Sequence, residues 1–517
     1  MITPAEEVRM SAASHTPSAR RVAGGATRAA QPLQLLLVVA IAVILRAFNS
    51  ANVDVSWAIT MCEKMLAGAR LYVDLIENNP PASAFLYLPA VLLARALGLS
   101  SEFVVDVLVF LAAGVSLSMA GLILRRTRVL DGVDAWSLAT WSAAVLLILP
   151  MHTFGEREHI ATIVLLPLLA LLLVRATDRA PAWHWTVVAG IGAGVAITIK
   201  PYFAIPVGLA VAAAAYARGS WRVFFASENW VAGAIAVAFG AYVIVAYPEF
   251  INEVVPLAQA VYLPVREGLF ALLTTASMLC WMAAVVLLVC WLLRALLAPP
   301  FSPLFAASVG FATVYFIQGK GWPYHAYPAL ALALIALALA GAMPRPASKT
   351  GTVPHNLFPV DSMIPVVVLA ALICVSLNAA VNMAPLIDPI RALKVRPSLL
   401  TITADIAVGH PLVRELQGKW VSRGCALWIS AGVFRRLVDE KLDPDQKAAL
   451  KRFAARDRDM LVEDIRRNRP DIILVEKGVF DWEAWARADP LVAAELAHYR
   501  EAGRVAAFLI LQRDEAR

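Results

Sequence analysis

Long apolar runs separated by short polar turns dominate the first three quarters of the chain. A helix that crosses a bilayer needs about 20 apolar residues, with a range of roughly 17–25. Runs that meet or nearly meet this length predict eleven membrane-spanning helices. They cover residues 31–49, 102–124, 134–151, 160–175, 184–199, 201–217, 229–247, 270–294, 303–317, 327–343 and 362–383.

The stretch between the first two spans is too long and too patterned to be a simple connector. Residues 81–97 are apolar but contain Pro89 and Arg95, and Ser56–Gly68 repeats a large apolar residue every four positions. Both patterns predict amphipathic helices that lie along the membrane surface. We therefore expect a long outer loop, 52–101, that holds two interfacial helices.

The distribution of Lys and Arg predicts the orientation of the chain, because cytoplasmic loops are enriched in these residues. If 81–97 stays at the interface, twice as many Lys and Arg lie on the side of the N-terminus as on the other side. If 81–97 crosses, the majority moves to the outer side. The first arrangement is favoured, so residues 1–30 are expected to be a cytoplasmic tail. The C-terminal domain then lies outside the cytoplasm, on the periplasmic face of an inner membrane.

Residues 385–517 have a different pattern, with about one residue in three charged against about one in ten before them. Asp443-Pro444 is a typical helix start, with an Asp cap and Pro at the first helical position. The expected strands are Leu399–Ile406, Ala426–Ser430, Ile472–Val475 and Val505–Leu511, and the expected helices are Asp443–Arg469, with a break in its middle as an alternative, and Trp482–Arg500. The fold class is thus an all-α polytopic membrane domain, 31–384, followed by a small soluble α/β domain, 385–517, in which we find no catalytic motif.

Composition excludes several classes of protein. The chain is 60% apolar and 16% charged, whereas soluble domains are about 45–50% apolar and about 25% charged. Its mean hydropathy is +0.69. These values exclude a soluble enzyme and a disordered chain. The net charge of +7 is not gathered on a polar surface, as it is in nucleic-acid binders, so no nucleic-acid partner is expected.

Ionisable residues near a membrane are costly and therefore suggest function. At the outer ends of the spans four clusters stand out, Asn52–Trp57, Phe154–His159, Lys200–Tyr202 and Gln318–His325. Each cluster also has a structural interpretation: Asp54 as a solvated carboxylate at a helix end, Lys200 as a snorkelling side chain, and the Gly-Lys-Gly-Trp run as an aromatic-belt turn. The run of four ionisable residues at 156–159 is the hardest to explain structurally.

Together these clusters offer what transfer from a lipid-linked phosphate requires. A carboxylate can take the proton of an attacking hydroxyl, while Arg, Lys and His stabilise the charge that grows on the departing phosphate. The candidate catalytic residues are Asp54, Glu156 and Glu158. The candidate donor-phosphate ligands are Arg157, His159, Lys200, Lys320 and His325, and the candidate substrate-binding residues are Tyr72, Asp74, Tyr202, Trp322 and Tyr324. We expect Arg157, Lys200, Lys320 and His325 to surround one outward-facing cavity.

The first outer loop carries a recognisable order of motifs: Asp54 directly after the first span, then Gly68-Ala69-Arg70-Leu71-Tyr72-Val73-Asp74, then Asn79-Pro80-Pro81. This order resembles the GT-C superfamily of polyprenyl-phosphate-sugar glycosyltransferases over roughly residues 31–384. It is similar to protein O-mannosyltransferases, lipid A aminoarabinose transferases and the rhizobial galacturonosyltransferase type. The resemblance implies a polyprenyl-phosphate sugar donor, inversion at the sugar carbon, and Asp54 as the catalytic residue.

The chain departs from the family at one place. Many relatives have Asp-Glu at the first motif, whereas this chain has Asp54-Val55. Any role of that Glu must be absent here or must fall to Glu156 or Glu158, since the second outer loop of the family also contributes acidic or polar groups. Some relatives need a divalent metal and others do not, so the resemblance leaves metal dependence open.

The sequence therefore predicts a membrane glycosyltransferase that moves a sugar from a polyprenyl-phosphate donor to an extracytoplasmic lipid, glycan or protein, with Asp54 as general base. One alternative is a transporter or flippase for a lipid-linked or anionic solute. Secondary transporters usually place ionisable groups near the midplane, often in repeated halves, and no such repeat is present. The other alternative is a noncatalytic scaffold, for which eleven spans are excessive.

Overall fold

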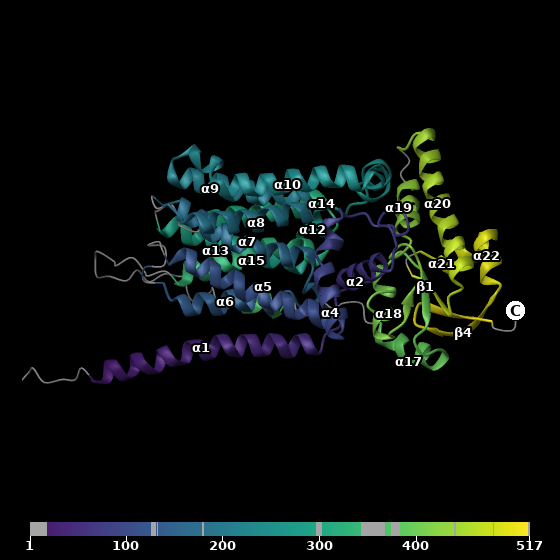
Figure 1. The fold of residues 1–517 in the computed structure, drawn as a ribbon, viewed down its shortest axis with the longest axis horizontal. Coiled ribbons are helices and arrows are strands. Elements are labelled where there is room, and N and C mark those ends of the chain that lie inside the picture. Colours follow the sequence, from purple (N-terminus) through teal and green to yellow (C-terminus); the bar gives the residue numbers. More distant parts are fainter. Residues whose placement is uncertain are drawn as a thin grey trace, which may run out of the picture.

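The computed structural model describes most of the chain, and Figure 1 shows its ribbon. The described residues are 18–125, 131, 133–177, 180–295, 302–342, 368–373, 383–438, 441–478 and 480–514. Most of the expected N-terminal tail, 1–30, and most of the last expected span, 362–383, lie outside them.

Apolar helices lie side by side and run nearly parallel, forming a bundle (Figure 1). They are α1 (Ser18–Ala47), α5 (Ser101–Leu124), α6 (Ala135–Leu147), α7 (Arg157–Arg175), α8 (Trp183–Ile199), α9 (Ala204–Arg218), α10 (Ser227–Ala246), α13 (Ala276–Ala295), α14 (Ser302–Gln318) and α15 (Pro323–Ala342). Each expected span except the last overlaps one of these helices. Among the described residues, α5, α7, α10 and α15 are long and apolar enough to cross a membrane, while the other apolar helices are shorter.

Helices α7 and α15 form the interior of the bundle, because nearly all of each is buried, whereas α10 is mostly exposed. Short helices join the long ones: η2 (Met151–Thr153), η3 (Pro201–Phe203), η4 (Trp221–Phe225), η5 (Phe250–Val254), α11 (Val255–Leu257), η6 (Ala258–Tyr262) and α12 (Leu269–Leu273). The site described below uses the first turn of α7, so some of its side chains come from a buried helix of the bundle.

The first outer loop folds into α2 (Val53–Leu66), α3 (Ala82–Phe85) and α4 (Leu88–Leu97). Helix α2 starts earlier than expected because the Asn52 side chain accepts hydrogen bonds from the backbone N–H groups of Asp54 and Val55. The position of this helix along the membrane surface stays a prediction. All residues from Val55 to Cys62 are buried, and the C-terminal part of the chain covers one side of the helix, where Trp57 packs against His410.

The C-terminal unit, residues 384–514, is a small α/β structure. Its elements are α17 (Ala384–Leu393), β1 (Ser398–Ile402), η7 (Ile406–Val408), α18 (Leu412–Glu415), β2 (Lys419–Trp420), α19 (Trp428–Leu437), α20 (Pro444–Asn468), β3 (Ile472–Glu476), α21 (Trp482–Ala488), α22 (Pro490–Leu496), β4 (Tyr499–Val505) and β5 (Phe508–Arg513). The five-stranded sheet has the order β2-β1-β3-β5-β4. Strand β1 pairs in parallel with β2 and β3, and β5 pairs antiparallel with β3 and β4.

Several expected elements of this unit are corrected by the structure. Ala426–Ser430 is not a strand but the entry into α19, whose Ile429 and Val433 are buried. The expected helix Trp482–Arg500 is two helices, because Asp489 caps α22 and a proline follows it, and its last residues belong to β4. Val505–Leu511 contains the turn between β4 and β5. Helix α20 is continuous, without the alternative break, and starts with a capping box at Asp443.

The C-terminal unit covers one end of the bundle, which we call the capped end (Figure 1). Helices α2 and α4 lie at this end, and α1 begins at the opposite end. One continuous apolar core runs from Trp57 of α2 into Leu412 and Trp420 of the C-terminal unit. The two parts of the chain therefore pack as one body around the site.

Candidate active site

A cavity of about 980 Å³ lies at the capped end, between the membrane helices and the C-terminal unit. The first part of the chain lines it with Asp54, Trp57, Glu77, Asn79, His152, Glu156, Arg157, Lys200, Tyr262, Lys320, Trp322 and Tyr324, and the C-terminal unit adds Asp405, Glu415, Cys425, Trp428 and Arg435, among others. The structure thus brings side chains from distant segments to one space.

Asp54 and Arg157 face each other across this cavity. The Asn52 cap places Asp54 in the first turn of α2, and Arg157 begins α7. Arg157 Nη2 lies 3.5 Å from Asp54 Oδ1, and the Arg157 side chain is 8% exposed against 23% for Asp54. Within the described residues, Arg157 Nε has no hydrogen-bond partner. The guanidinium therefore retains a buried donor group for a ligand.

Glu156 is fully buried beside this pair. Neither of its carboxyl oxygens has a hydrogen-bond partner among the described residues. Burial, followed by the neighbouring charge of Asp54, raises the pKa of Glu156 well above its usual range, since a desolvated carboxyl disfavours its charged form.

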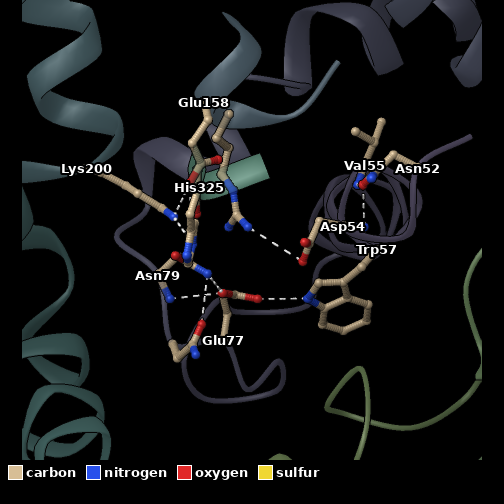
Figure 2. Close-up of polar contacts among 12 residues, drawn as sticks. Asn52, Asp54, Val55, Trp57, Glu77, Asn79, Glu158, Lys200 and His325 are labelled. Carbon is tan, nitrogen blue, oxygen red and sulfur yellow. Dashed lines mark hydrogen bonds and ion pairs between the residues drawn. The ribbon is translucent and has the colours of Figure 1, made fainter. Parts of the chain in front are cut away.

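Lys200 reaches the cavity from the turn between α8 and η3, and its ammonium contacts three other polar side chains. Its ammonium pairs with Glu158, lies 3.3 Å from His325 Nε2 and lies 3.4 Å from Gln318 Oε1. Figure 2 shows Glu158, Lys200 and His325 pointing toward one another. Neither Glu158 nor His325 is among the residues that line the cavity. These two residues thus contact Lys200 from outside the cavity lining.

Lys320 enters the cavity from the turn between α14 and α15. Its ammonium donates to the carbonyl oxygens of Tyr262 (2.6 Å) and Val265 (2.5 Å) and lies 3.9 Å from the centre of the Tyr262 ring. Burial, with the nearby charges of Arg435 and Arg266, lowers the pKa of Lys320 to about 8. Trp322 and Tyr324, from the same turn, also line the cavity.

A hydrogen-bonded group formed by Trp57, Glu77 and Asn79 was not predicted. Trp57 Nε1 donates to Glu77 Oε2 at 2.8 Å, and Glu77 Oε1 accepts from the Asn79 backbone N–H at 2.9 Å and from Asn79 Nδ2 at 2.5 Å (Figure 2). Glu77 is 5% exposed. Its position directly before Asn78-Asn79-Pro80-Pro81 was the available signal in the sequence. The cavity residues of the C-terminal unit had no such signal.

Besides Glu158 and His325, four other candidate residues do not line the cavity. His159 is buried and holds the backbone of its own turn, accepting from the Gly155 N–H and donating to the Leu146 carbonyl. The Tyr72 hydroxyl donates to the Asn79 carbonyl, and Asp74 forms an exposed ion pair with Arg70. Tyr202 is 38% exposed outside the cavity.

Over the part of the chain that the structure describes, no group of three or more His, Cys, Asp or Glu side chains could hold a metal ion. Asp54, which lines the cavity, is close to the Arg157 guanidinium instead.

Comparison with known proteins gives a structural neighbour. No family model matches the chain, and no curated protein matches it. Among solved structures, ArnT from Cupriavidus metallidurans bound to undecaprenyl phosphate is similar over 93% of this chain and 98% of its own, with a TM-score of 0.57 and 15% sequence identity. This similarity confirms, at the level of the fold, the resemblance drawn from the sequence motifs. With its apolar helices, the chain is a membrane protein.

Proposed function

We propose that this chain is a membrane glycosyltransferase that moves a sugar from a polyprenyl-phosphate donor to a hydroxyl of an extracytoplasmic acceptor. The observation that carries the proposal is the pairing of Asp54 with Arg157 inside a cavity at one end of a membrane helix bundle. A structural neighbour that binds undecaprenyl phosphate supports a lipid donor. The carboxylate supplies a base, and the guanidinium supplies a phosphate ligand.

The proposed reaction is a single displacement. The carboxylate of Asp54 takes the proton of the acceptor hydroxyl, and the hydroxyl oxygen attacks the anomeric carbon opposite the phosphate. The bond between that carbon and the phosphate oxygen breaks, and the lipid phosphate leaves with the electron pair. The configuration of the sugar carbon is therefore inverted.

The cations of the cavity suit the charge that develops on the leaving phosphate. Arg157 offers an unpartnered buried N–H, and guanidinium groups bind phosphate oxygens in a bidentate manner. Lys200 and Lys320 line the same cavity from two other turns. Preorganised donors of this kind, held away from water, give the largest stabilisation of a developing charge. Trp322 and Tyr324 are proposed to contact the sugar or the start of the lipid.

A transporter is the less suitable assignment for the same residues. Transporters usually bind their substrate near the bilayer midplane, whereas the cavity lies at the capped end of the bundle. With the charge distribution of the loops, this favours an outer-face transferase with its C-terminal unit in the periplasm. The acceptor class, whether lipid, glycan or protein, is not specified by these residues.

The test is the Asp54→Asn variant, assayed with purified protein in lipid nanodiscs and a synthetic undecaprenyl-phosphate sugar. The amide has the size of the carboxylate but cannot accept the proton, so turnover should fall by about 10²–10⁴-fold, the usual contribution of base catalysis. Donor binding, measured separately with undecaprenyl phosphate, should change little, because Arg157 and the lysines remain.

The matched control is Asp388→Asn, which makes the same chemical change at an exposed position on α17 and should leave turnover unchanged. Transfer by Asp54→Asn at the wild-type rate would refute the base assignment. If Glu156→Gln were then inactive, the base would lie on the second outer loop instead.

A further inference from the structure

The C-terminal unit contacts α2, the helix that carries Asp54, along one face. Ser56 Oγ lies 3.4 Å from His410 Nδ1, Thr60 Oγ1 lies 3.4 Å from Arg414 Nη1, and Glu63 pairs with Arg414. Residues spaced by three and four positions share one face of a helix. The contact is therefore a continuous seam along α2 and not an isolated pair.

Arg414 is the strongest point of this seam. Its Nη1 and Nη2 donate to the two carboxyl oxygens of Glu63 at 2.8 and 2.9 Å, and its Nε donates to Glu102 of α5. The Arg414 side chain is 16% exposed. Bidentate Arg–carboxylate pairs fix geometry as well as contributing energy. One guanidinium thus joins α2, α5 and the C-terminal unit.

His410 forms the other end of the seam. It is fully buried, and its ring lies edge-on to Trp57, with 5.4 Å between the ring centres, and 4.7 Å from the ring of Trp420. Burial and the nearby charges of Arg414 and Lys64 lower the pKa of His410 to about 3. The ring therefore stays neutral at ordinary pH and acts through packing and its contact with Ser56.

After this seam, two hydrogen bonds to backbone carbonyl groups of the C-terminal unit also attach the first outer loop to it. Lys64 Nζ donates to the carbonyl oxygen of Ser422 at 2.7 Å, and the N–H of Ile76 donates to the carbonyl oxygen of Arg423 at 3.0 Å. By contrast, the connection of the start of α2 to the helix bundle includes the hydrogen bond of Asn52 Nδ2 to His152 and the loose pair of Asp54 with Arg157. The C-terminal unit therefore supplies much of the polar attachment of α2.

We propose that Arg414 and His410 are positioning residues, through which the C-terminal unit holds α2 so that Asp54 faces Arg157. This inference rests on the proposed function of Asp54. A misplacement of about 1 Å at a reacting group can cost about 10²-fold in rate. The C-terminal unit is therefore a working part of the active site, although neither Arg414 nor His410 lines the cavity.

The experiment compares Arg414→Ala with a second variant that leaves no unpaired charge, Arg414→Met with Glu63→Gln and Glu102→Gln. Removing one partner of a buried ion pair is strongly destabilising, whereas removing all charges together is often nearly neutral. Turnover should fall by about 10–100-fold in both variants. The KM for the lipid donor should stay within about twofold, because its proposed ligands are on the membrane helices.

The control is Arg466→Ala, which removes an Arg–Glu pair (Arg466 Nη2 to Glu495 Oε1, 2.7 Å) inside the C-terminal unit and away from α2. It should keep wild-type turnover. Folding of each variant is checked by size-exclusion chromatography and thermal unfolding in detergent.

A positioning role for Arg414 also predicts the activity of a variant that combines Arg414→Ala with Asp54→Asn. Because Arg414 acts through Asp54, adding Arg414→Ala to Asp54→Asn should reduce residual transfer by no more than about twofold. Full additivity of the two losses, or wild-type turnover in the folded three-residue variant, would overturn the inference. Failure of the proposed function has a different signature, namely wild-type transfer by Asp54→Asn itself.

Discussion

The buried ion pair of Glu158 with Lys200 predicts how much stability is lost when one of its partners is replaced. Glu158 is 1% exposed and the Lys200 side chain 9%, and within the described residues the second carboxyl oxygen of Glu158 has no partner. Glu158→Gln would leave the Lys200 ammonium buried without a counter-charge. Losing one partner of such a pair costs about 3–5 kcal/mol. The Gln carbonyl still accepts a hydrogen bond from Lys200, so a loss of about 3 kcal/mol is expected.

Lys200→Met should be similarly destabilising, because it leaves the Glu158 carboxylate alone. The double variant Glu158→Gln/Lys200→Met buries no net charge, and its stability should return to within about 1 kcal/mol of the wild type. The assay is chemical unfolding in detergent micelles, followed by tryptophan fluorescence. Glu253→Gln is the control, because its pair with Arg456 is exposed on both sides and such pairs contribute about 0–1 kcal/mol.

The reasoning fails if the two single losses simply add in the double variant. Additivity would mean that Glu158 and Lys200 stabilise the protein independently of each other. Transfer activity is not the readout here, because Lys200 also lines the cavity and its removal weakens the proposed phosphate site.

Two further predictions concern the walls of the cavity. The pKa of Lys320 is lowered to about 8, so the positive charge of its side chain is lost as pH rises through that value. The KM for the donor should therefore rise above pH 8 in the wild type but not in Lys320→Arg, and an equal rise in both proteins would exclude Lys320 as a ligand. Burial and the charges of Glu77 and Asp54 raise the pKa of the Cys425 thiol. Maleimide labelling of Cys425, followed by mass spectrometry, should therefore be slow, and undecaprenyl phosphate should slow it further; labelling insensitive to the lipid would place the donor elsewhere.

Much of this arrangement follows from local sequence. Span positions depend on apolar length, and the position of Asp54 depends on the Asn52 cap two residues earlier, so both are readable from neighbouring residues. The run Glu156–His159 shows what the local sequence does not predict, namely which of its four side chains line the cavity. Successive residues of a helix are rotated by about 100°, so Glu156 and Arg157 line the cavity while Glu158 and His159 turn toward the bundle interior.

The rest of the site depends on contacts between distant segments. The sequence shows Arg414 as one of many charged residues in a polar region, and nothing near it indicates Glu63 as its partner. The Ala426–Ser430 run was predicted as a strand because its apolar residues are adjacent. The structure uses Trp428 for the cavity wall and Ile429 for the core, which a helix allows.

The ion pair between Arg414 and Glu63 also affects when α2 can reach its final contacts during synthesis of the chain. The two residues are 351 positions apart, so a ribosome completes α2 long before the residues that hold it. During that interval the side of α2 where Trp57 packs against His410 is uncovered. A nascent chain stalled before α18 therefore has its membrane helices but lacks the residues that contact α2 from the C-terminal unit. It should be a preferred target of chaperones and proteases that recognise exposed apolar segments.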